Sequence, residues 1–303
     1  MPINRSKIEE FKGLELIAKR VVEGFITGLH KSPFHGFSVE FAEHRLYNTG
    51  ESTKHIDWKL YGRTEKLFIK RYEEETNLRC QIVIDTSGSM HFPLDKNDNK
   101  LNFSVQAAAA LTELLKHQRD AVGLTTFDSE IRDHLVAKSY PVHFKHIFNK
   151  LENILEQDFK NKPTSAASAL NEIAEIIHKR SLVLIFSDMF ESQANNDELF
   201  SALQHLMYKK HEVVLFHVVD KKKELEFNFE NKPYHFIDLE SGEEIKLNPN
   251  QIKEQYLKSI NEFNAELKIK CGQFKIELVE ADINEGFDKV LYTYLVKRNM
   301  LLK

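Results

Sequence analysis

The chain alternates short apolar runs with longer segments whose apolar residues recur every three or four positions. The short runs predict strands, and the longer spacing predicts amphipathic helices. Strands are expected at residues 80–85, 120–127, 181–187, 213–219 and 274–279, with a short hairpin partner at 131–136. Helices are expected at about 101–118, 143–156, 165–179, 197–209, 250–270 and 286–299. Because strands and helices alternate, the sequence predicts an α/β fold, with a mostly parallel sheet and helices on both faces.

Two segments depart from this alternation. Residues 1–77 combine apolar residues at helical spacing, over 7–30, with a mixed stretch that includes a strand-like run at 66–70. We expect them to form an N-terminal α+β module, and residues 78–303 to form the α/β domain. Residues 221–248 are expected to be an insertion in that domain, because they contain a hairpin-like pattern around a Ser-Gly turn.

Composition narrows the class of protein. The formal net charge is −4, so nothing indicates a general nucleic-acid-binding protein. Cys80 and Cys271 lack the spacing of a zinc site or a disulfide framework, and we expect both to be small core residues. No apolar run reaches the ~18–20 residues of a membrane span, and the first residues do not resemble a signal peptide. We therefore expect a cytoplasmic protein without a direct membrane span.

Candidate metal ligands lie where the apolar runs end. Asp85-x-Ser87-x-Ser89 follows the first strand, Asp188 closes the strand at 181–187, and Thr164 precedes the helix at 165–179. Each motif alone has a second explanation, because Asp, Ser and Thr are good helix N-caps. Jointly they supply carboxylate and hydroxyl oxygens, which hard cations prefer, at strand ends that meet along one edge of a sheet. The set predicts a site for a divalent cation, Mg²⁺ first, with Mn²⁺ or Ca²⁺ also compatible.

These motifs resemble those of a known family. Asp85-x-Ser87-x-Ser89, with Thr164 and Asp188, resembles the metal-ion-dependent adhesion site of von Willebrand factor A domains. Residues 45–58, Arg-Leu-Tyr-Asn-Thr-Gly-Glu-Ser-Thr-Lys-His-Ile-Asp-Trp, resemble the signature of the bacterial family called domain of unknown function 58. The resemblance implies a von Willebrand A-like domain behind a family-specific N-terminal module. It also implies a MoxR-type AAA+ ATPase as partner, since members are commonly associated with such ATPases.

The expected function is therefore protein interaction without catalysis. A cation held by one carboxylate and neutral hydroxyls keeps positive charge, so it could accept an Asp or Glu side chain from the ATPase or its client. The alternative is a magnesium-dependent phosphohydrolase of the haloacid-dehalogenase type, with Asp85 as nucleophile. That chemistry usually needs a second Asp two residues further on, where this chain has Ser87.

A second cluster of chemistry-bearing residues surrounds the single tryptophan. It comprises Arg45, Tyr47, Asp57, Trp58 and Arg63. The cluster could be a partner-docking surface, but we interpret it as a buried ion pair in an aromatic setting that orients the N-terminal module. On that interpretation Trp58 is buried.

Overall fold

The computed structural model describes residues 14–28, 40–47, 56–73, 78–94, 98–156, 166–190, 196–239 and 242–301. The chain divides into two compact units. The smaller is Phe34–Leu78, and the larger combines Met1–Pro33 with Arg79–Lys303. The smaller unit is therefore inserted in the sequence of the larger one.

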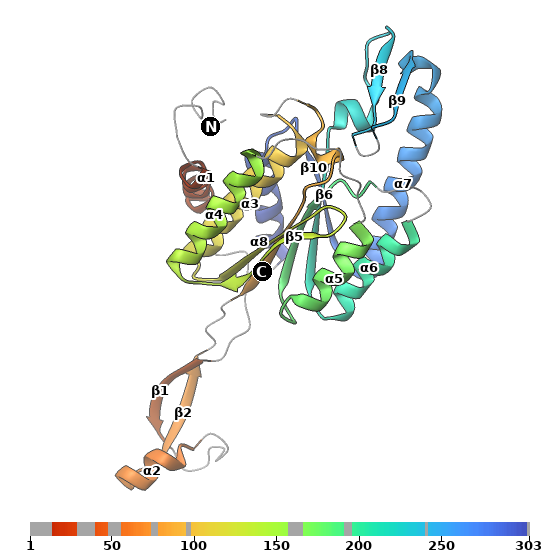
Figure 1. The fold of residues 1–303 in the computed structure, drawn as a ribbon. Coiled ribbons are helices and arrows are strands. Elements are labelled where there is room, and N and C mark those ends of the chain that lie inside the picture. The colour runs from red at the N-terminus through yellow and green to blue at the C-terminus, as the bar shows by residue number, and fades with distance from the viewer. Residues whose placement is uncertain are drawn as a thin grey trace. The chain divides into compact units, whose positions relative to one another are not determined.

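A six-stranded sheet forms the centre of the larger unit (Figure 1). The strand order is β10-β7-β6-β3-β4-β5, and every neighbouring pair is parallel except β4 and β5. The strands are β3 (Arg79–Asp85), β4 (Ala121–Phe127), β5 (Ile131–Lys138), β6 (Leu182–Ser187), β7 (Glu212–Val219) and β10 (Glu277–Asp282). The expected α/β fold with a mostly parallel sheet is confirmed.

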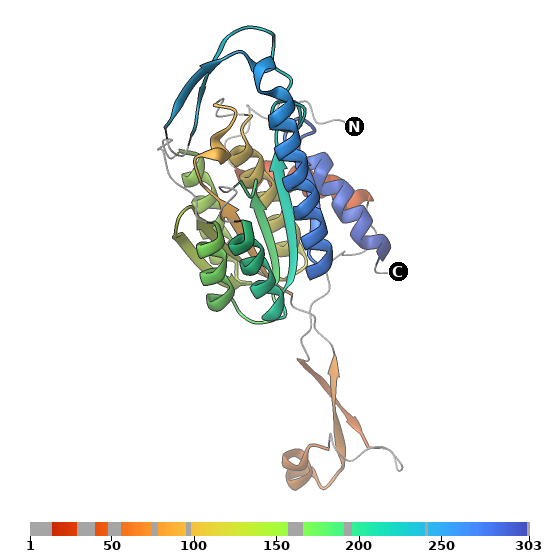
Figure 2. The same cartoon turned by 90° about the vertical axis from the view of Figure 1, so that its right-hand side faces the viewer.

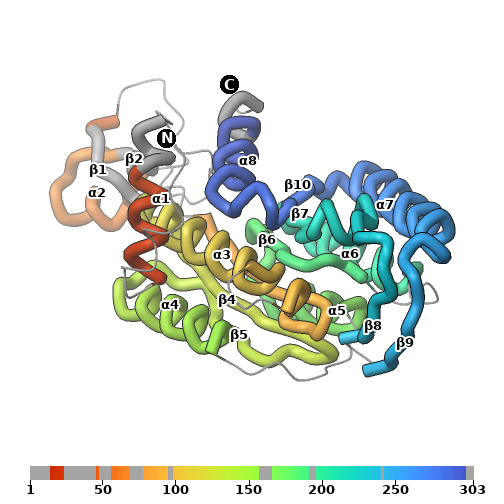
Figure 3. Tube along the Cα trace, turned by 90° about the horizontal axis from the view of Figure 1, so that it is seen from above, coloured from red at the N-terminus to blue at the C-terminus, as the bar shows by residue number. Residues whose placement is uncertain are grey.

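Helices cover both faces of this sheet (Figures 2 and 3). One face carries α3 (Lys100–His117), α4 (Pro141–Glu156) and α8 (Phe287–Leu301). The other carries α5 (Ala166–Ile176), α6 (Asn196–Tyr208) and α7 (Lys253–Phe274). Covered on both faces, the central strands are apolar along nearly their whole length, and β3 is buried from Cys80 to Asp85. The two cysteines are buried, as expected for core residues.

The first described helix, α1 (Leu14–Gly28), packs on α3 and α4 in the larger unit. Its apolar face is buried, and the Glu15 carboxylate lies 3.2 Å from Lys116 Nζ on α3. The Leu14 N–H donates to Glu152 Oε1 on α4 at 2.9 Å. The predicted module of residues 1–77 is thus divided between the two units, because the apolar face of α1 packs against α3 and α4 of the α/β domain.

The smaller unit contains an antiparallel strand pair, β1 (Glu40–Leu46) and β2 (Phe68–Glu73), with the short helix α2 (Trp58–Thr64) between them in sequence. Asp57 is the N-cap of α2, where its carboxylate accepts hydrogen bonds from the N–H groups of Lys59 and Leu60. The Trp58 side chain is 62% exposed and meets only the edge of Tyr61 among the aromatic rings described. The expectation of a buried tryptophan is therefore wrong, since α2 buries no side chain. The side chain of Arg45 lies outside the described residues.

The insertion after β7 begins with a π-helical turn, η5 (Lys221–Leu225), and continues into the antiparallel pair β8 (Tyr234–Ile237) and β9 (Glu244–Leu247). Short 3₁₀ turns occur at η3 (Ser89–His91) and η6 (Pro249–Gln251). Helix α7 extends four residues beyond the predicted end, so the last strand begins at Glu277 instead of residue 274. The helix ends at Lys275, which takes a left-handed φ of 60° as its C-cap, while Gly272 stays inside the helix.

Candidate metal centre

Strand β3 carries Asp85 to the carboxyl edge of the sheet. The strand lies between β4 and β6, parallel to both, so its last residue is enclosed from two sides. Asp85 is only 1% exposed. A carboxylate in such a place must be hydrogen-bonded, neutralised or paired with a cation.

The loop after β3 folds back onto this carboxylate. The Ser87 N–H donates to Asp85 Oδ1 at 2.9 Å, and Ser87 Oγ lies 3.1 Å from Ser89 Oγ. Thr86 fixes the loop to the neighbouring strand, because its N–H and its hydroxyl both donate to the carbonyl oxygen of Phe127. The three residues of the Asp-x-Ser-x-Ser motif are thereby brought together.

Strand β6 brings a second carboxylate to the same edge. Ser187, its last residue, donates its hydroxyl to Asp85 Oδ2 at 2.7 Å. Asp188 follows and is 1% exposed, and its Oδ1 accepts the N–H of Phe190 at 3.2 Å. Burial and the neighbouring charge of Asp188 raise the pKa of Asp85 to about 7, because two desolvated carboxylates resist ionising together.

The backbone at Asp188 is held from the neighbouring strand. His217 on β7 lies with its Nε2 3.0 Å from the carbonyl oxygen of Asp188. Burial lowers the pKa of His217 to about 4, so the ring is neutral at pH 7 and its N–H donates to that carbonyl. Four of the five predicted ligands, Asp85, Ser87, Ser89 and Asp188, therefore lie at this edge. The fifth, Thr164, lies outside the described residues.

Sequence reasoning missed two charged residues next to this site, Lys100 and Glu224. Lys100 Nζ lies 2.6 Å from Asp188 Oδ2 and 2.6 Å from Glu224 Oε1. Lys100 is the first residue of α3, directly after the N-cap Asn99. A cation is unfavourable beside the positive end of a helix dipole, and that placement is the sequence signal that could have drawn attention to it.

The donor set fits a hard divalent cation. It combines carboxylate oxygens of Asp85 and Asp188 with the hydroxyls of Ser87 and Ser89, which is oxygen-only chemistry of the kind Mg²⁺ prefers. Burial and repulsion from Asp188 both raise the pKa of Asp85, and a bound cation would favour its ionised form. In the described ranges no group of three or more His, Cys, Asp or Glu side chains is suited to a metal.

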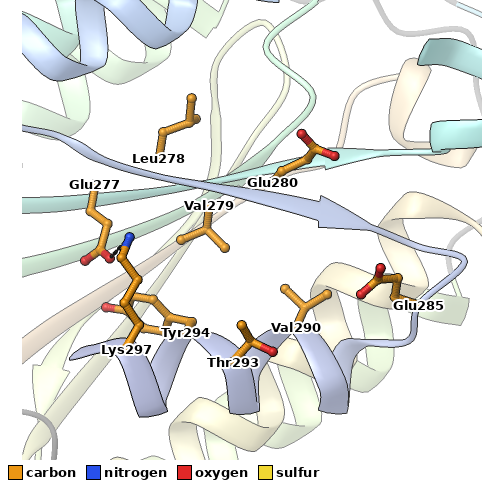
Figure 4. Close-up of a pocket in the computed structure, with 9 residues that line it drawn as sticks. All are labelled: Glu277, Leu278, Val279, Glu280, Glu285, Val290, Thr293, Tyr294 and Lys297. Carbon is orange, nitrogen blue, oxygen red and sulfur yellow. Dashed lines mark ion pairs between the residues drawn. The ribbon is translucent and has the colours of Figure 1, made fainter. Parts of the chain in front are cut away.

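A separate hollow lies between β10 and α8, at the edge of the sheet (Figure 4). Its lining is mixed, with Val279 and Val290 beside Glu280 and Thr293, and the Glu277–Lys297 ion pair of 3.4 Å closes one end. Strands β7 and β6 separate β10 from β3 in the sheet. The hollow therefore belongs to a different part of the domain from the candidate metal centre.

The structure shows an α/β protein in which two carboxylates and two hydroxyls lie at the carboxyl edge of a mostly parallel sheet. The model of one family matches residues 43–266, which cover both the 45–58 signature and the site. The chain belongs to that family, described as protein of unknown function DUF58.

Curated relatives share this part of the chain. The uncharacterized protein Mb1516 of Mycobacterium bovis and the uncharacterized protein Rv1480 of Mycobacterium tuberculosis are each 24% identical to it over 209 residues. The match covers 69% of this chain and 64% of each relative, so the chain spans about two thirds of the length of the relatives it matches.

The solved structures that match part of this chain include two from Bacteroides. An aerotolerance-related membrane protein from Bacteroides fragilis has a TM-score of 0.46 at 15% identity, covering 73% of this chain and 98% of that one. The conserved hypothetical protein BatB from Bacteroides thetaiotaomicron has a TM-score of 0.41 at 16% identity, with the same coverage. A von Willebrand factor type A protein from Catenulispora acidiphila has a TM-score of 0.33 at 13% identity, covering 49% of this chain and 34% of that one. Among the described residues, no helix has the length and apolarity to cross a membrane.

Proposed function

We propose that this chain is a non-enzymatic, metal-dependent interaction protein. Asp85, Ser87 and Ser89 hold a divalent cation, most fittingly Mg²⁺, with Asp188 and Thr164 completing the site. The partner is a MoxR-type AAA+ ATPase or its client, which presents an acidic side chain to the ion. The proposed role is that of an adaptor or chaperone-like factor.

One observation supports this proposal above all. The buried carboxylates of Asp85 and Asp188 and the hydroxyls of Ser87 and Ser89 lie together at the carboxyl edge of the sheet. Ser187 and the Ser87 N–H orient the Asp85 carboxylate through both of its oxygens. Each carboxylate oxygen has a second lone pair, so these hydrogen bonds leave acceptor capacity for a cation. When bound, the cation supplies a positively charged, directional contact for an anionic ligand.

The phosphohydrolase alternative has weaker support from the same residues. An aspartyl nucleophile needs a nearby group that can exchange protons near neutral pH, usually a second carboxylic acid two residues on. That position is Ser87, whose hydroxyl lies 3.1 Å from Ser89 Oγ. Release of phosphate from a generic aryl phosphate in Mg²⁺, lost in Asp85→Ala, would favour the hydrolase instead.

Location in the cytoplasm is part of the proposal. It is supported by the use of only two cysteines, both buried in the core and without the spacing of a disulfide framework, as is typical of proteins in a reducing compartment. Both thiols should resist oxidation in the folded protein, because each lies in the core.

The experiment is co-purification of a MoxR-type ATPase of the source organism with the tagged chain, in Mg²⁺ and in EDTA. Parent protein should retain the ATPase in Mg²⁺ only, and Asp85→Ala in neither condition. The matched control is Asp133→Ala, which removes a carboxylate on β5 that pairs with Lys150. Capture that is equal for all proteins in both conditions would remove the metal face as the contact surface.

A further inference from the structure

Lys100 is a buried cation that joins the candidate metal centre to the insertion after β7. Its side chain is 1% exposed, and its ammonium group lies 2.6 Å from one oxygen each of Asp188 and Glu224. The rings of Phe190 and Phe92 stand 5.3 and 6.0 Å from the ammonium nitrogen. Carboxylates and aromatic faces together replace the water that a lysine normally keeps.

The position of Lys100 is energetically unfavourable for a charged side chain. Burying an ammonium carries a desolvation penalty that ion pairing often only balances. The start of α3 adds the unfavourable helix dipole. What the ammonium does achieve is neutralisation of two carboxylates, Asp188 and Glu224, the first of which also repels the charge of Asp85.

The Lys100 ammonium also links two loops, one after β6 and one after β7, to the start of α3. Asp188 follows β6, and Glu224 belongs to η5 after β7, so Lys100 ties both to the start of α3. The second oxygen of Glu224 accepts the N–H of Asp220 at 2.7 Å, which fixes the carboxylate against its own loop. Removing the ammonium would therefore leave Asp188, next to Asp85, and Glu224 without the counter-charge of Lys100.

We propose that Lys100 is a tethered cation that positions Asp188 and opposes the charge of the divalent ion. The inference rests on the proposed metal site and adds how its affinity is set. The ammonium keeps the metal-free protein folded by neutralising the carboxylates. It also lowers the affinity of the site for a divalent ion, so that loading is reversible and follows the free metal concentration.

The test is the sign of the change in metal affinity in Lys100→Met. Titration of the full chain with Mn²⁺ by calorimetry should give a dissociation constant about tenfold or more below that of the parent, because a repelling charge is gone. In EDTA the same variant should unfold at a lower temperature than the parent, and Mn²⁺ should raise its melting temperature by more. Simple structural damage would instead weaken metal binding.

Two controls separate charge from packing. Lys100→Arg keeps the charge and should bind Mn²⁺ more like the parent than Lys100→Met does. Lys223→Met removes a lysine that lies 5.5 Å from the Phe92 ring, in the same loop as Glu224, and should leave the affinity unchanged. If Lys100→Met does not fold, Glu224→Gln tests the same idea: its loss of negative charge should weaken Mn²⁺ binding severalfold.

The outcomes distinguish the two proposals. A parent protein that gives no Mn²⁺ heat overturns the metal site, and with it the role of Lys100. A parent that binds Mn²⁺ while Lys100→Met binds it equally or more weakly overturns the tethered cation alone. An unchanged affinity in Glu224→Gln likewise counts against it.

Discussion

Asp85 is the residue on which the site depends, and its environment sets what its substitution should do. The carboxylate is buried, and Asp188 helps to raise its pKa to about 7. Asp85→Asn keeps the shape of the side chain and an oxygen for the Ser87 N–H, but removes the charge. We expect Asp85→Asn to give no heat with Mn²⁺ and to be at least as stable as the parent in EDTA.

Calorimetry and thermal unfolding in EDTA check both parts of this prediction. Adding Mg²⁺ should raise the melting temperature of the parent and leave that of Asp85→Asn unchanged, because only the parent binds the ion in its folded state. A variant clearly less stable than the parent in EDTA would mean that repulsion between the two carboxylates is unimportant. Asp85→Ala is a poorer probe of stability, since it leaves the Ser187 hydroxyl and the Ser87 N–H without their acceptor.

Trp58 gives a second prediction at the residue scale. Because its side chain is 62% exposed, Trp58→Ala should change the free energy of unfolding by less than about 0.5 kcal/mol. Chemical denaturation followed by circular dichroism measures this, since the variant has no tryptophan to report by fluorescence. The parent's tryptophan emission should resemble that of indole in water. A loss of about 3 kcal/mol or more would indicate a buried side chain.

The sequence predicted the acidic and hydroxyl ligands because their types and their place after apolar runs are local signals. The pairing of Lys100 with Glu224 could not be found in this way. The two residues are 124 positions apart in the chain, and only the order of β6, β3 and β7 in the sheet brings them to one place. The burial of Trp58 was mispredicted because residue type alone does not tell whether a short helix has a surface to pack against.

Helix α4 shows how a single hydrogen bond can make an element sensitive to pH. His143 near its start is buried, and its Nε2 lies 2.8 Å from the carbonyl oxygen of Val122 on β4. Burial lowers the pKa of His143, and the charges of Lys138 and His146 add to the effect. The unfolded chain therefore binds more protons below about pH 6.5, and stability is lost as the pH falls through that range.

His143→Gln should reduce this loss, because glutamine can donate to the same carbonyl without titrating. The measurement is the free energy of unfolding at about pH 7 and pH 5, where the parent should lose more stability than the variant. His146→Gln, at an exposed position on the same helix, removes only one of the smaller causes of the shift and should stay closer to the parent than His143→Gln does. Equal losses for parent and His143→Gln would show that His143 does not contribute to the pH dependence.

Element types were predictable wherever apolar periodicity is strong, as in β3, β6 and β7. The boundaries of the elements were harder to predict than their types. The end of α7, for example, depends on the left-handed backbone conformation of Lys275, which costs free energy in any residue with a side chain. Strand β1 and helix α2 were not predicted at all. Seven residues of α2 with no buried face carry no apolar periodicity for the sequence to show.

At the scale of the whole molecule, the division into units predicts which parts can be removed. A chain in which a short Gly/Ser linker replaces residues 34–78 keeps α1 and the entire six-stranded sheet. We expect it to unfold cooperatively and to bind Mn²⁺ as the parent does. A chain that begins at residue 78 loses α1, which buries Leu14, Ala18, Val21 and Val22.

The truncated chain should therefore be less stable than the linker variant, by about 3 kcal/mol or more. Denaturant titration of the two proteins side by side gives the comparison. If the linker variant fails to fold while the truncated chain folds, then α1 and residues 34–78 form a single unit, as the sequence first suggested.

The insertion of residues 34–78 into the larger unit also gives the chain a form of protection against proteases. A single cut inside this segment should not release either fragment, because both fragments contain parts of the larger unit. The upstream fragment still ends in a chain anchored by α1 on α3 and α4, and the downstream fragment carries the rest of the larger unit. A nicked molecule would migrate as one species under native conditions and as two on a denaturing gel. Removal of residues 34–78 from the protein would require two separate cleavages, one on each side of the segment.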